Sequence, residues 1–185
     1  MEELGTKRLI LRDFRIDDWK AVHEYAADPR AVERMPWGPN SADQTIEFVR
    51  KAIEEAGRPN RKTFELAIIL REEDRLIGGA GLRVSGTENR DASLGYIVNP
   101  AFWKRGYAGE AAAAMVEFGF RQRGLHRIWA TCDPDNSASA RVLEKIGMIR
   151  EGRLRQNLWR KGDWRDSLLY SVLYPEWKLA REATA

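Results

Sequence analysis

The chain has 185 residues, 43% of them hydrophobic, which predicts a single α/β domain over residues 1–185 and excludes a disordered chain. Its 31 basic and 28 acidic residues give a formal net charge of +3, an excess too small to predict a nucleic-acid-binding protein. The one cysteine, Cys132, excludes an internal disulfide, and His23 and His126 lie too far apart in the sequence to indicate a metal-ligand cluster.

No segment approaches the roughly 18–20 consecutive apolar residues that a membrane-spanning helix needs. The N-terminus begins with two acidic residues soon after the methionine and has no long apolar run, unlike a signal peptide. We therefore expect no membrane partner, no metal and a cytoplasmic location.

The N-terminal part of the chain predicts one strand and two helices. Lys7–Phe14 alternates apolar and charged residues, as a half-buried strand does. Asp17 fits the N-cap of a first helix, and Met35–Asn40 is rich in turn-forming residues. Ser41, with Gln44 three residues later, forms a capping box that predicts the start of a second helix.

The middle of the chain predicts an antiparallel meander followed by a long helix. Thr63–Leu70, Leu76–Val84 and Ala92–Val98 are strand-like and are separated by charged or Gly/Asn-containing turns. The alanine-rich segment Gly106–Gln122 then predicts a helix.

The C-terminal part predicts a strand, a helix and a hairpin. His126–Cys132 is strand-like, and Ser137–Ile146 is helical and is followed by a glycine. Arg153–Trp159 and Trp164–Leu173 predict a hairpin around a Lys-Gly-Asp turn. The order of elements predicts a mixed α/β fold with a mostly antiparallel sheet.

The junction before the alanine-rich helix has the features of a phosphate site. A helix start exposes backbone amides, and the helix dipole favours an anion there. Gly106, Ala108 and Gly109 leave room for a ligand, and Lys104 and Arg105 add positive charge. The pattern GxxxxGK[ST] is absent and repeated βαβ units do not follow, which excludes a P-loop and a dinucleotide-binding fold. A turn with a helix cap is the simpler alternative.

The junction before the next helix is a second short polar turn. Asn136 or Ser137 is suited to be its N-cap, and Ser139 lies in its first turn. Taken alone, this segment is more simply a helix cap than a ligand site. Because both junctions lead from a strand into a helix, neighbouring strands could bring them to one cleft.

Several blocks along nearly the whole chain carry a resemblance to a known family. They are the opening KRLILR, the MPW segment at Met35–Trp37, GYIVNPAFWKRGYAGEA from Gly95 to Ala111, GLHRIWATCDPDNSASARVLEKIGM and the closing EGRLRQNLWRKGDWRDSLLYSVL. In these blocks the chain resembles the GNAT superfamily of acetyltransferases, and within it the ribosomal-protein-alanine acetyltransferase (RimJ/RimL-type) branch. The resemblance implies a GNAT-like fold, with a central, mostly antiparallel twisted sheet of about seven strands. Helices would cover both faces, and splayed strands would hold acetyl-CoA.

The resemblance also implies where acetyl-CoA binds. The family's pyrophosphate pattern, Gln/Arg-x-x-Gly-x-Gly/Ala, falls on residues 103–108, where Gly106 and Ala108 match and Trp103 departs from the first position. The backbone of the splayed fourth strand would pair with the pantetheine arm. Asn136 would also contact the arm, and Ser139 would lie close to the sulfur. The implied acetyl-CoA-binding residues are Ile97, Val98, Lys104, Arg105, Gly106, Tyr107, Ala108, Gly109, Asn136 and Ser139.

The implied chemistry is direct attack of a neutral amine on the thioester, without a covalent acyl-enzyme. Cys132 has no identifiable histidine partner that would make it a nucleophile. The amide of Val98 is the candidate donor to the oxyanion, and Ser139 is the candidate hydroxyl for the thiolate leaving group.

The base that takes the amine proton is left unassigned by the sequence. Many relatives carry a glutamate on the fourth strand, where this chain has Ser93. Glu65, which we keep as a candidate substrate-site residue, and Asp166 are substitutes, each with a structural hydrogen-bonding role as the alternative. A water chain to backbone carbonyls is a third option.

The acceptor side is predicted around Met35–Asn40 and the loop near Trp159 and Lys161. Trp37 either lines an acceptor pocket or covers the core. A peptide N-terminus, a polyamine, an amino acid or a drug amine would each fit, although the positive net charge weighs against a strongly cationic acceptor. An α-amine has a lower pKa than a lysine amine and would ask less of a missing base. The resemblance implies a monomer or a homodimer.

Two other functions stay open. Ser93 keeps a catalytically weak acyl-CoA-binding sensor or partner module as an alternative, whereas Asn136 and Ser139 argue against it because a pure binder needs no proton donor at the sulfur. The basic run from Arg150 to Arg165 is either a solvated hairpin face or an anion-facing surface. A nucleic-acid-associated protein would use that run, but the net charge is lower than such proteins usually carry.

Overall fold

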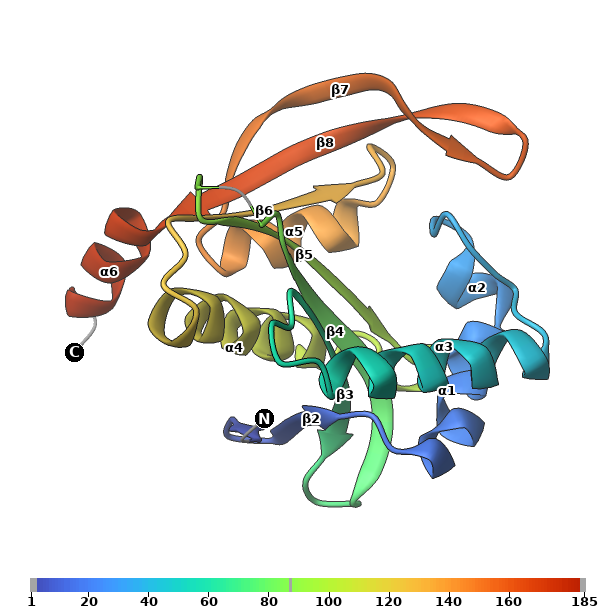
Figure 1. The fold of residues 1–185 in the computed structure, drawn as a ribbon. Coiled ribbons are helices and arrows are strands. Elements are labelled where there is room, and N and C mark those ends of the chain that lie inside the picture. Colours follow the sequence, from blue (N-terminus) through green and yellow to red (C-terminus); the bar gives the residue numbers. More distant parts are fainter. Residues whose placement is uncertain (1–2, 87, 184–185) are drawn as a thin grey trace.

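The computed structural model describes residues 3–86 and 88–183, whose strands form one eight-stranded sheet (Figure 1). The strand order is β1-β2-β3-β4-β5-β6-β8-β7, and every neighbouring pair is antiparallel except β5 and β6. The strands are β1 (Leu4–Gly5), β2 (Leu9–Asp13), β3 (Thr63–Leu70), β4 (Arg75–Val84), β5 (Asp91–Val98), β6 (Arg127–Cys132), β7 (Ile149–Arg160) and β8 (Asp163–Leu173).

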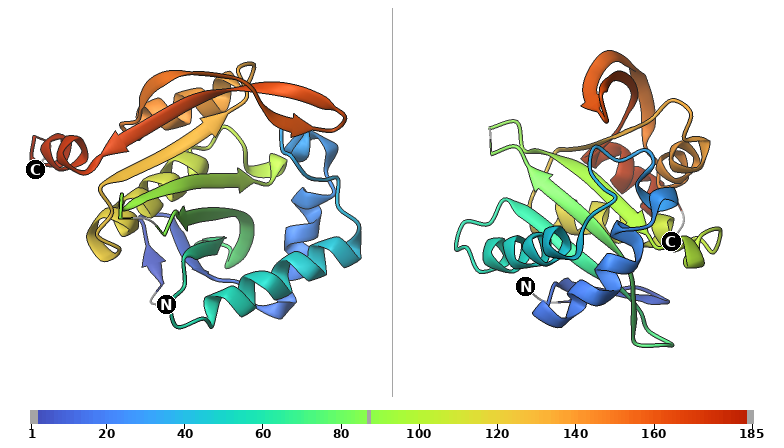
Figure 2. Two further views of the ribbon diagram at one scale, coloured as in Figure 1. Left: turned by 45° about the horizontal axis from the view of Figure 1, so that its top comes forward. Right: turned by 90° about the vertical axis from the view of Figure 1, so that its right-hand side faces the viewer.

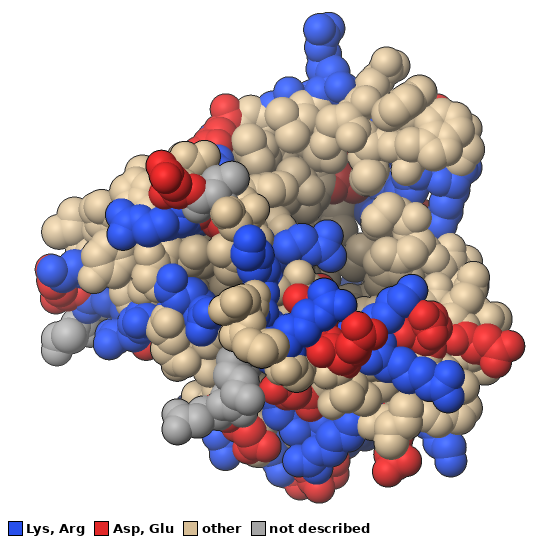
Figure 3. Space-filling view, viewed as in Figure 1, with Lys and Arg blue, Asp and Glu red and all other residues tan. Residues whose placement is uncertain are grey.

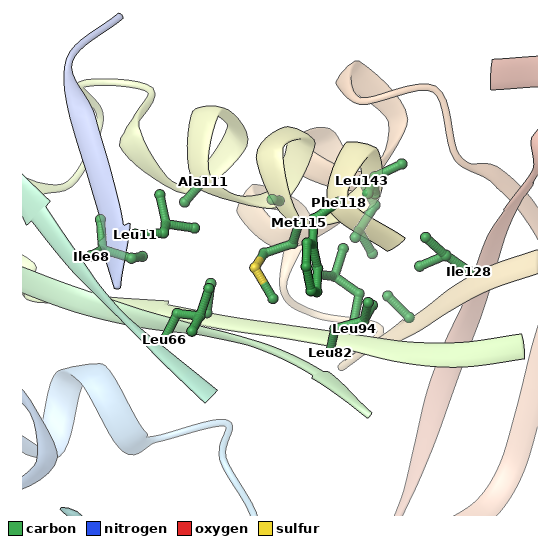
Figure 4. Packing of buried hydrophobic residues seen from close by; sticks show 14 of the residues in the cluster. Leu11, Leu66, Ile68, Leu82, Leu94, Ala111, Met115, Phe118, Ile128 and Leu143 are labelled. Carbon is green, nitrogen blue, oxygen red and sulfur yellow. The ribbon is translucent and has the colours of Figure 1, made fainter. Parts of the chain in front are cut away.

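Helices cover both faces of the sheet (Figure 2). On one face α1 and α3 share a core cluster with β3, which includes Val22, Val49 and Ala67. On the other face Met115 and Phe118 of α4 point toward the leucines of β3, β4 and β5 (Figure 4). The helices are η1 (Ile16–Asp18), α1 (Trp19–Ala26), α2 (Pro29–Val32), α3 (Ala42–Ala56), η2 (Pro100–Phe102), α4 (Tyr107–Gln122), α5 (Ser137–Lys145) and α6 (Tyr174–Glu182).

Strand β3 is buried on both faces, which explains its nearly continuous apolar sequence. Leu66 and Ile68 belong to the α4 side of the core, and Ala67 and Ile69 belong to the α1–α3 side. By the same alternation Glu65, the strand's one charged residue, faces the α1–α3 side.

Strands β5 and β6 pair only at their beginnings and then separate, as the resemblance implies. Their parallel register covers residues 91–93 of β5 and 127–129 of β6. Beyond these residues β5 continues along β4, whereas β6 continues along β8. We call the space between the separated ends of β5 and β6 the strand split.

The long hairpin β7–β8 extends away from the body of the sheet and its tip returns to the segment around α2 (Figure 2). The turn residues Lys161 and Gly162 have φ of 49° and 86°, as a two-residue type I′ turn requires. Arg160 and Asp163 close the ladder on either side of it. The hairpin and its turn are therefore confirmed.

Five features differ from the sequence-based predictions. The sheet has eight strands because the two-residue β1 pairs with β2, and both α2 and α6 were not predicted. Strand β7 begins at Ile149 rather than at Arg153, since the residues before Arg153 continue the ladder with β8. The predicted cap at Asp17 is wrong. Instead, the carboxylate of Asp18 accepts a 2.7 Å hydrogen bond from the backbone nitrogen of Arg15.

The capping box at the start of α3 is confirmed. The backbone nitrogen of Gln44 donates to Oγ of Ser41 at 3.2 Å, and the backbone nitrogen of Ser41 donates to Oε1 of Gln44 at 2.8 Å. Within residues 3–86 and 88–183, no helix is long and apolar enough to cross a membrane. The same described residues hold no group of three or more His, Cys, Asp or Glu side chains placed to bind a metal ion.

Candidate active site

The start of α4 is a left-handed glycine without a side-chain cap. Gly106 is the N-cap residue at φ 81°, a conformation that costs glycine little. Because no side chain accepts a hydrogen bond at this cap, the first-turn amides of the 16-residue helix are left to bind an anion. Lys104, itself left-handed at φ 62°, and Arg105 lie just before it. This geometry fits a pyrophosphate group.

A contact that the sequence did not reveal joins the N-terminal strand region to the start of α4. The Glu110 carboxylate accepts hydrogen bonds from Oγ1 of Thr6 (2.7 Å) and from the backbone nitrogen (2.8 Å) and Nε (2.7 Å) of Arg8. Burial opposes ionisation of Glu110, but these hydrogen bonds lower its pKa overall. The Arg8 guanidinium also donates to the Arg105 carbonyl at 2.9 Å and lies 4.6 Å from the Tyr107 ring centroid. Arg8 therefore adds a partly exposed cation beside the helix start.

The backbone of β5 presents different groups at Ile97 and Val98. The Ile97 carbonyl faces β4, and the backbone nitrogen of Asn99 donates to the Ile77 carbonyl of β4 at 2.8 Å. Because successive peptide groups of a strand point to opposite sides, the N–H and C=O of Val98 point away from β4 and into the strand split. The Val98 carbonyl accepts a 2.7 Å hydrogen bond from Nε1 of Trp103. Only Val98 of the two thus offers polar backbone groups to the split.

The start of α5 brings the Ser139 hydroxyl against the Tyr96 hydroxyl of β5 beside the split. Asn136 caps the helix, since its Oδ1 accepts a 3.0 Å hydrogen bond from the backbone nitrogen of Ser139. Oγ of Ser139 lies 3.0 Å from the Tyr96 hydroxyl. Burial, partly offset by the hydrogen bond with Ser139, raises the pKa of Tyr96 to about 12, so the phenol keeps its proton at neutral pH.

Tyr96 was missed in the sequence, although a signal for it exists. It lies two residues before Val98 and packs against the same core cluster as Val98, on the α4 side of the sheet. A polar residue at an inward position of a strand that ends in a ligand site is the pattern that points to it.

Cys132 has the environment of a structural cysteine. It is the last residue of β6 and is 7% exposed. Burial, and then the Asp133 carboxylate, raise the pKa of its thiol. A protonated, buried thiol is a poor nucleophile, which fits direct attack without an acyl-enzyme.

The residues considered for proton removal lie in different environments. Asp166 accepts from the backbone nitrogen of Gln156 (2.8 Å) and from Nε of Arg153 (2.6 Å), and these bonds hold its pKa below the usual range. Its role is therefore to join the two strands of the hairpin. Glu65 is half-buried, burial raises its pKa, and none of the described residues gives it a hydrogen bond or ion pair. Ser93 lies in the paired part of β5.

The tip of the hairpin is fastened across the molecule by a set of contacts that we call the hairpin clasp. Lys161 Nζ donates to the Val32 carbonyl at 2.8 Å, and Arg160 Nη1 donates to the Arg34 carbonyl at 3.0 Å. Arg160 also pairs with Oδ2 of Asp133 at 2.7 Å, with the two side chains 8% and 9% exposed. Figure 3 shows a hollow beneath the hairpin, with basic and acidic side chains at its margin.

Exposed tryptophans occur on the segments that the clasp joins. Trp37 is 38% exposed and belongs to neither core cluster, which disfavours the interpretation that it covers the core. Trp159 and Trp164 pack edge to face at the hairpin tip with ring centroids 5.3 Å apart, and both are more than half exposed.

Three of the six basic side chains between Arg150 and Arg165 are paired with carboxylates. A cavity of about 640 Å³ lies against it, lined by Arg153, Leu154, Arg155, Gln156 and Asp166. The pairs are Arg153 with Asp166, Arg160 with Asp133 and Arg165 with Asp163.

An open sheet with one parallel pair that splays, beside an uncapped helix start, fits the CoA-thioester-binding domain that the sequence resemblance implies. Residues 8–149 match the family model described as the acetyltransferase (GNAT) domain, and the chain belongs to this family. It is an N-acetyltransferase that uses acetyl-CoA as the acetyl donor, as the sequence predicts.

Relatives and solved structures agree with this assignment. The chain is 39% identical over 174 residues to the uncharacterised N-acetyltransferase YnaD of Bacillus subtilis, covering 94% of this chain and 98% of YnaD. It is 27% identical over 186 residues to the [ribosomal protein uS5]-alanine N-acetyltransferase of Escherichia coli, covering 96% and 94%. A GNAT acetyltransferase structure from Bacillus anthracis has a TM-score of 0.82 at 35% identity, covering 93% of this chain and 98% of that one. Mycobacterium smegmatis RimJ in complex with CoA-disulfide has a TM-score of 0.84 at 26% identity, covering 95% and 88%.

Proposed function

We propose that the protein acetylates a primary amine, at a protein N-terminus or on a small molecule, by direct attack on acetyl-CoA without an acyl-enzyme. The observation that carries this proposal is the strand split with Val98 and Ser139 beside it. A thioester placed in the split would have the Val98 amide near its oxygen and a hydroxyl near its sulfur.

The acetyl-CoA site combines the start of α4 with the end of β5. The amides from Arg105 to Gly109, which include those of Tyr107 and Ala108, would hold the pyrophosphate, and Gly106 keeps the approach clear because only the flexible Arg8 guanidinium lies near its missing Cβ. Lys104 would add charge. The pantetheine arm would pair with the backbone at Val98 and receive a hydrogen bond from the amide nitrogen of Asn136, whose oxygen already caps α5.

The Ser139–Tyr96 pair would protonate or hydrogen-bond the departing sulfur. The raised pKa of Tyr96 keeps a proton on the phenol, so Tyr96 can support Ser139 as the hydroxyl that reaches the sulfur. An acyl-CoA sensor module remains the alternative, favoured by Ser93 in place of the glutamate of many relatives. A sensor module that only binds acyl-CoA would not need this pair of hydroxyl groups as a proton donor at the sulfur.

The acceptor would enter beneath the hairpin clasp. Because Arg160 and Lys161 fasten the hairpin to the segment before Trp37, the entrance is bounded on both sides, which favours a slender chain end or a small molecule. Trp37 would line this entrance. The enzyme would act in the cytoplasm as a monomer or homodimer, and the relative that acetylates an alanine of a ribosomal protein makes a protein N-terminus the first acceptor to try.

The test is CoA release from acetyl-CoA with a panel of peptides of varied N-termini, free amino acids, polyamines and aminoglycosides. Ser139→Ala should lower turnover with the best amine by about 10²-fold or more, and Asn136→Ala should weaken acetyl-CoA binding. Ser137→Ala, an exposed serine of the same helix, is the matched control and should behave as wild type. Tight acetyl-CoA binding with no turnover on any amine would overturn the enzyme proposal in favour of the sensor module.

A further inference from the structure

The face of the sheet opposite α4 carries a row of residues that runs from Glu65 to the strand split. Glu65 of β3 is in register with Gly81 of β4, and Gly81 is in register with Gly95 of β5. Paired residues of neighbouring strands point to the same face. The row therefore consists of one carboxylate followed by two positions without side chains.

The Glu65 side chain reaches over β4, so its carboxylate lies nearer the split than its own strand does. A Cβ at Gly81 would lie 2.5 Å from Oε2 and 2.8 Å from both Cδ and Oε1 of Glu65. The carboxylate thus occupies the space that a side chain at position 81 would fill. It is separated from Gly95 by about one strand spacing, roughly 4.8 Å.

The space above Gly95, on the α1–α3 face of the sheet, is not filled by other atoms. A Cβ built on Gly95 would have no atom within 4 Å, unlike the Cβ built on Gly81. Gly95 is also three residues before Val98, at the place where β5 has left β6. A water molecule over Gly95 could bridge the Glu65 carboxylate and an amine at the split.

The charge environment of Glu65 is that of a base and not of a structural ion pair. Burial raises its pKa, and the opposing influence of Arg83 and Arg61 does not restore the usual value. The Tyr25 hydroxyl of α1 lies near Gly79 of β4, and burial first and then the charge of Glu65 raise the pKa of the tyrosine. Glu65 has no hydrogen-bond or ion-pair partner among the described residues, and burying such a carboxylate lowers the stability of the fold. Carboxylates of this kind are found preferentially at functional sites.

We propose that Glu65 is the general base of the acetyl transfer, acting through a water over Gly95 in place of the carboxylate that Ser93 lacks. This inference rests on the proposed function. A bound ammonium group gives one proton through the water to Glu65, which releases it to solvent. The amine nitrogen then forms a bond to the acetyl carbon as the carbon–sulfur bond breaks, and the second proton ends on the thiol of CoA.

This arrangement places the two proton-transfer groups on opposite faces of the sheet. Ser139 and Tyr96 lie on the α4–α5 side, whereas Glu65 and Gly95 lie on the α1–α3 side. The strand split is the passage between them. Glu65 would thus take a proton from the amine on one face, and the Ser139–Tyr96 pair would hydrogen-bond the leaving sulfur on the other.

The first test is the pH dependence of kcat/KM in Glu65→Gln, with Glu72→Gln as the control. Glu72 is an exposed glutamate in the turn that follows β3. We expect Glu65→Gln to lose about 10²-fold or more near neutral pH, with the acetyl-CoA Kd within twofold of wild type. The loss should shrink about tenfold per pH unit as the pH approaches the amine pKa, because the variant can use only amine that is already neutral.

The second test uses Gly81→Ala, which disturbs the position of the carboxylate. The three atoms closest to the added Cβ all belong to the flexible end of Glu65, so the side chain rather than the backbone must move. Gly81→Ala should lower kcat/KM at least tenfold in wild type and have no further effect in Glu65→Gln. This non-additivity would show that the glycine acts through Glu65.

The outcomes distinguish the two proposals. If wild type turns over an amine but Glu65→Gln has the same pH profile, the base assignment is overturned and the transferase stands. A uniform loss at every pH, or full additivity of the two substitutions, would assign Glu65 a structural role and also overturn the inference. If wild type acetylates no amine, both proposals are wrong.

Discussion

Arg160→Ala tests how much the hairpin clasp contributes to the stability of the fold. Removing Arg160 deletes the ion pair with Asp133 and the hydrogen bond to the Arg34 carbonyl, and it leaves the Asp133 carboxylate buried. Breaking such a buried pair by removing one partner costs about 3–5 kcal/mol. Oδ1 of Asp133 still accepts a 2.9 Å hydrogen bond from the backbone nitrogen of Asp135, so we expect the lower end, about 3 kcal/mol.

This loss is large enough to measure by two methods. For a domain of this size about 3 kcal/mol corresponds to a fall in Tm of about 6–12 °C. Urea unfolding would give the free energy directly, with an unchanged m-value showing that the compactness of the folded state is kept. Arg153→Ala is the control, because its ion pair with Asp166 has an arginine that is 58% exposed and should contribute less than about 1 kcal/mol.

A double substitution separates charge pairing from packing. Arg160→Met with Asp133→Leu removes both charges, and it should recover most of the stability that Arg160→Ala loses. We expect the Michaelis constant for the amine to be raised in Arg160→Ala and in the double variant alike, because both lack the contact with the Arg34 carbonyl. An Arg160→Ala protein within about 0.5 kcal/mol of wild type would refute the argument that the pair is desolvated.

Three further predictions concern single residues. Glu110→Gln should lower the free energy of unfolding by about 1–2 kcal/mol at pH 7. Because hydrogen bonds lower the Glu110 pKa, this difference from wild type should vanish as the pH falls through that pKa. Chemical denaturation at several pH values would measure it. Gly106→Ala should lower the free energy of unfolding by about 1 kcal/mol and weaken acetyl-CoA binding measured by calorimetry. Gly124→Ala, also left-handed at φ 62°, should lower the stability by a similar amount without changing acetyl-CoA binding. Because burial raises the Glu65 pKa, its ionisation destabilises the fold as pH rises above 4.5. Glu65→Gln should therefore be at least as stable as wild type at pH 7, and a lower Tm would contradict this.

Most of the fold could be predicted because local sequence and tertiary structure agree. The hydrophobic run of β3, the capping box at Ser41 and the turn at Lys161 and Gly162 each specify one local conformation. The short elements could not be predicted for the opposite reason. Two residues in β1 and four in α2 are too few to show a periodicity. Strand β1 is defined by its pairing with β2, and the end of α2 accepts a hydrogen bond from Lys161, a residue far away in the sequence.

The candidate site was predictable only where backbone geometry makes it. The glycine at the start of α4 and the cap of α5 are local features, and both occur where the sequence places them. The partnership of Arg8 with Glu110 joins residues more than 100 positions apart, and that of Arg160 with Asp133 depends on where the hairpin tip returns. No spacing rule reveals such pairs, because the register of the sheet and the reach of the hairpin set them.

The position of the base illustrates why one missing residue need not abolish the chemistry. A carboxylate on β5 at Ser93 would lie in the paired part of the strand, on the α1–α3 face. A glutamate two strands away can serve the same face only if the strand between them carries no side chain in the row. Gly81 provides that gap, and Gly95 leaves the remaining distance open to water. The two glycines and Glu65 therefore form one unit, so a glutamate restored at position 93 should make Gly81→Ala harmless to turnover.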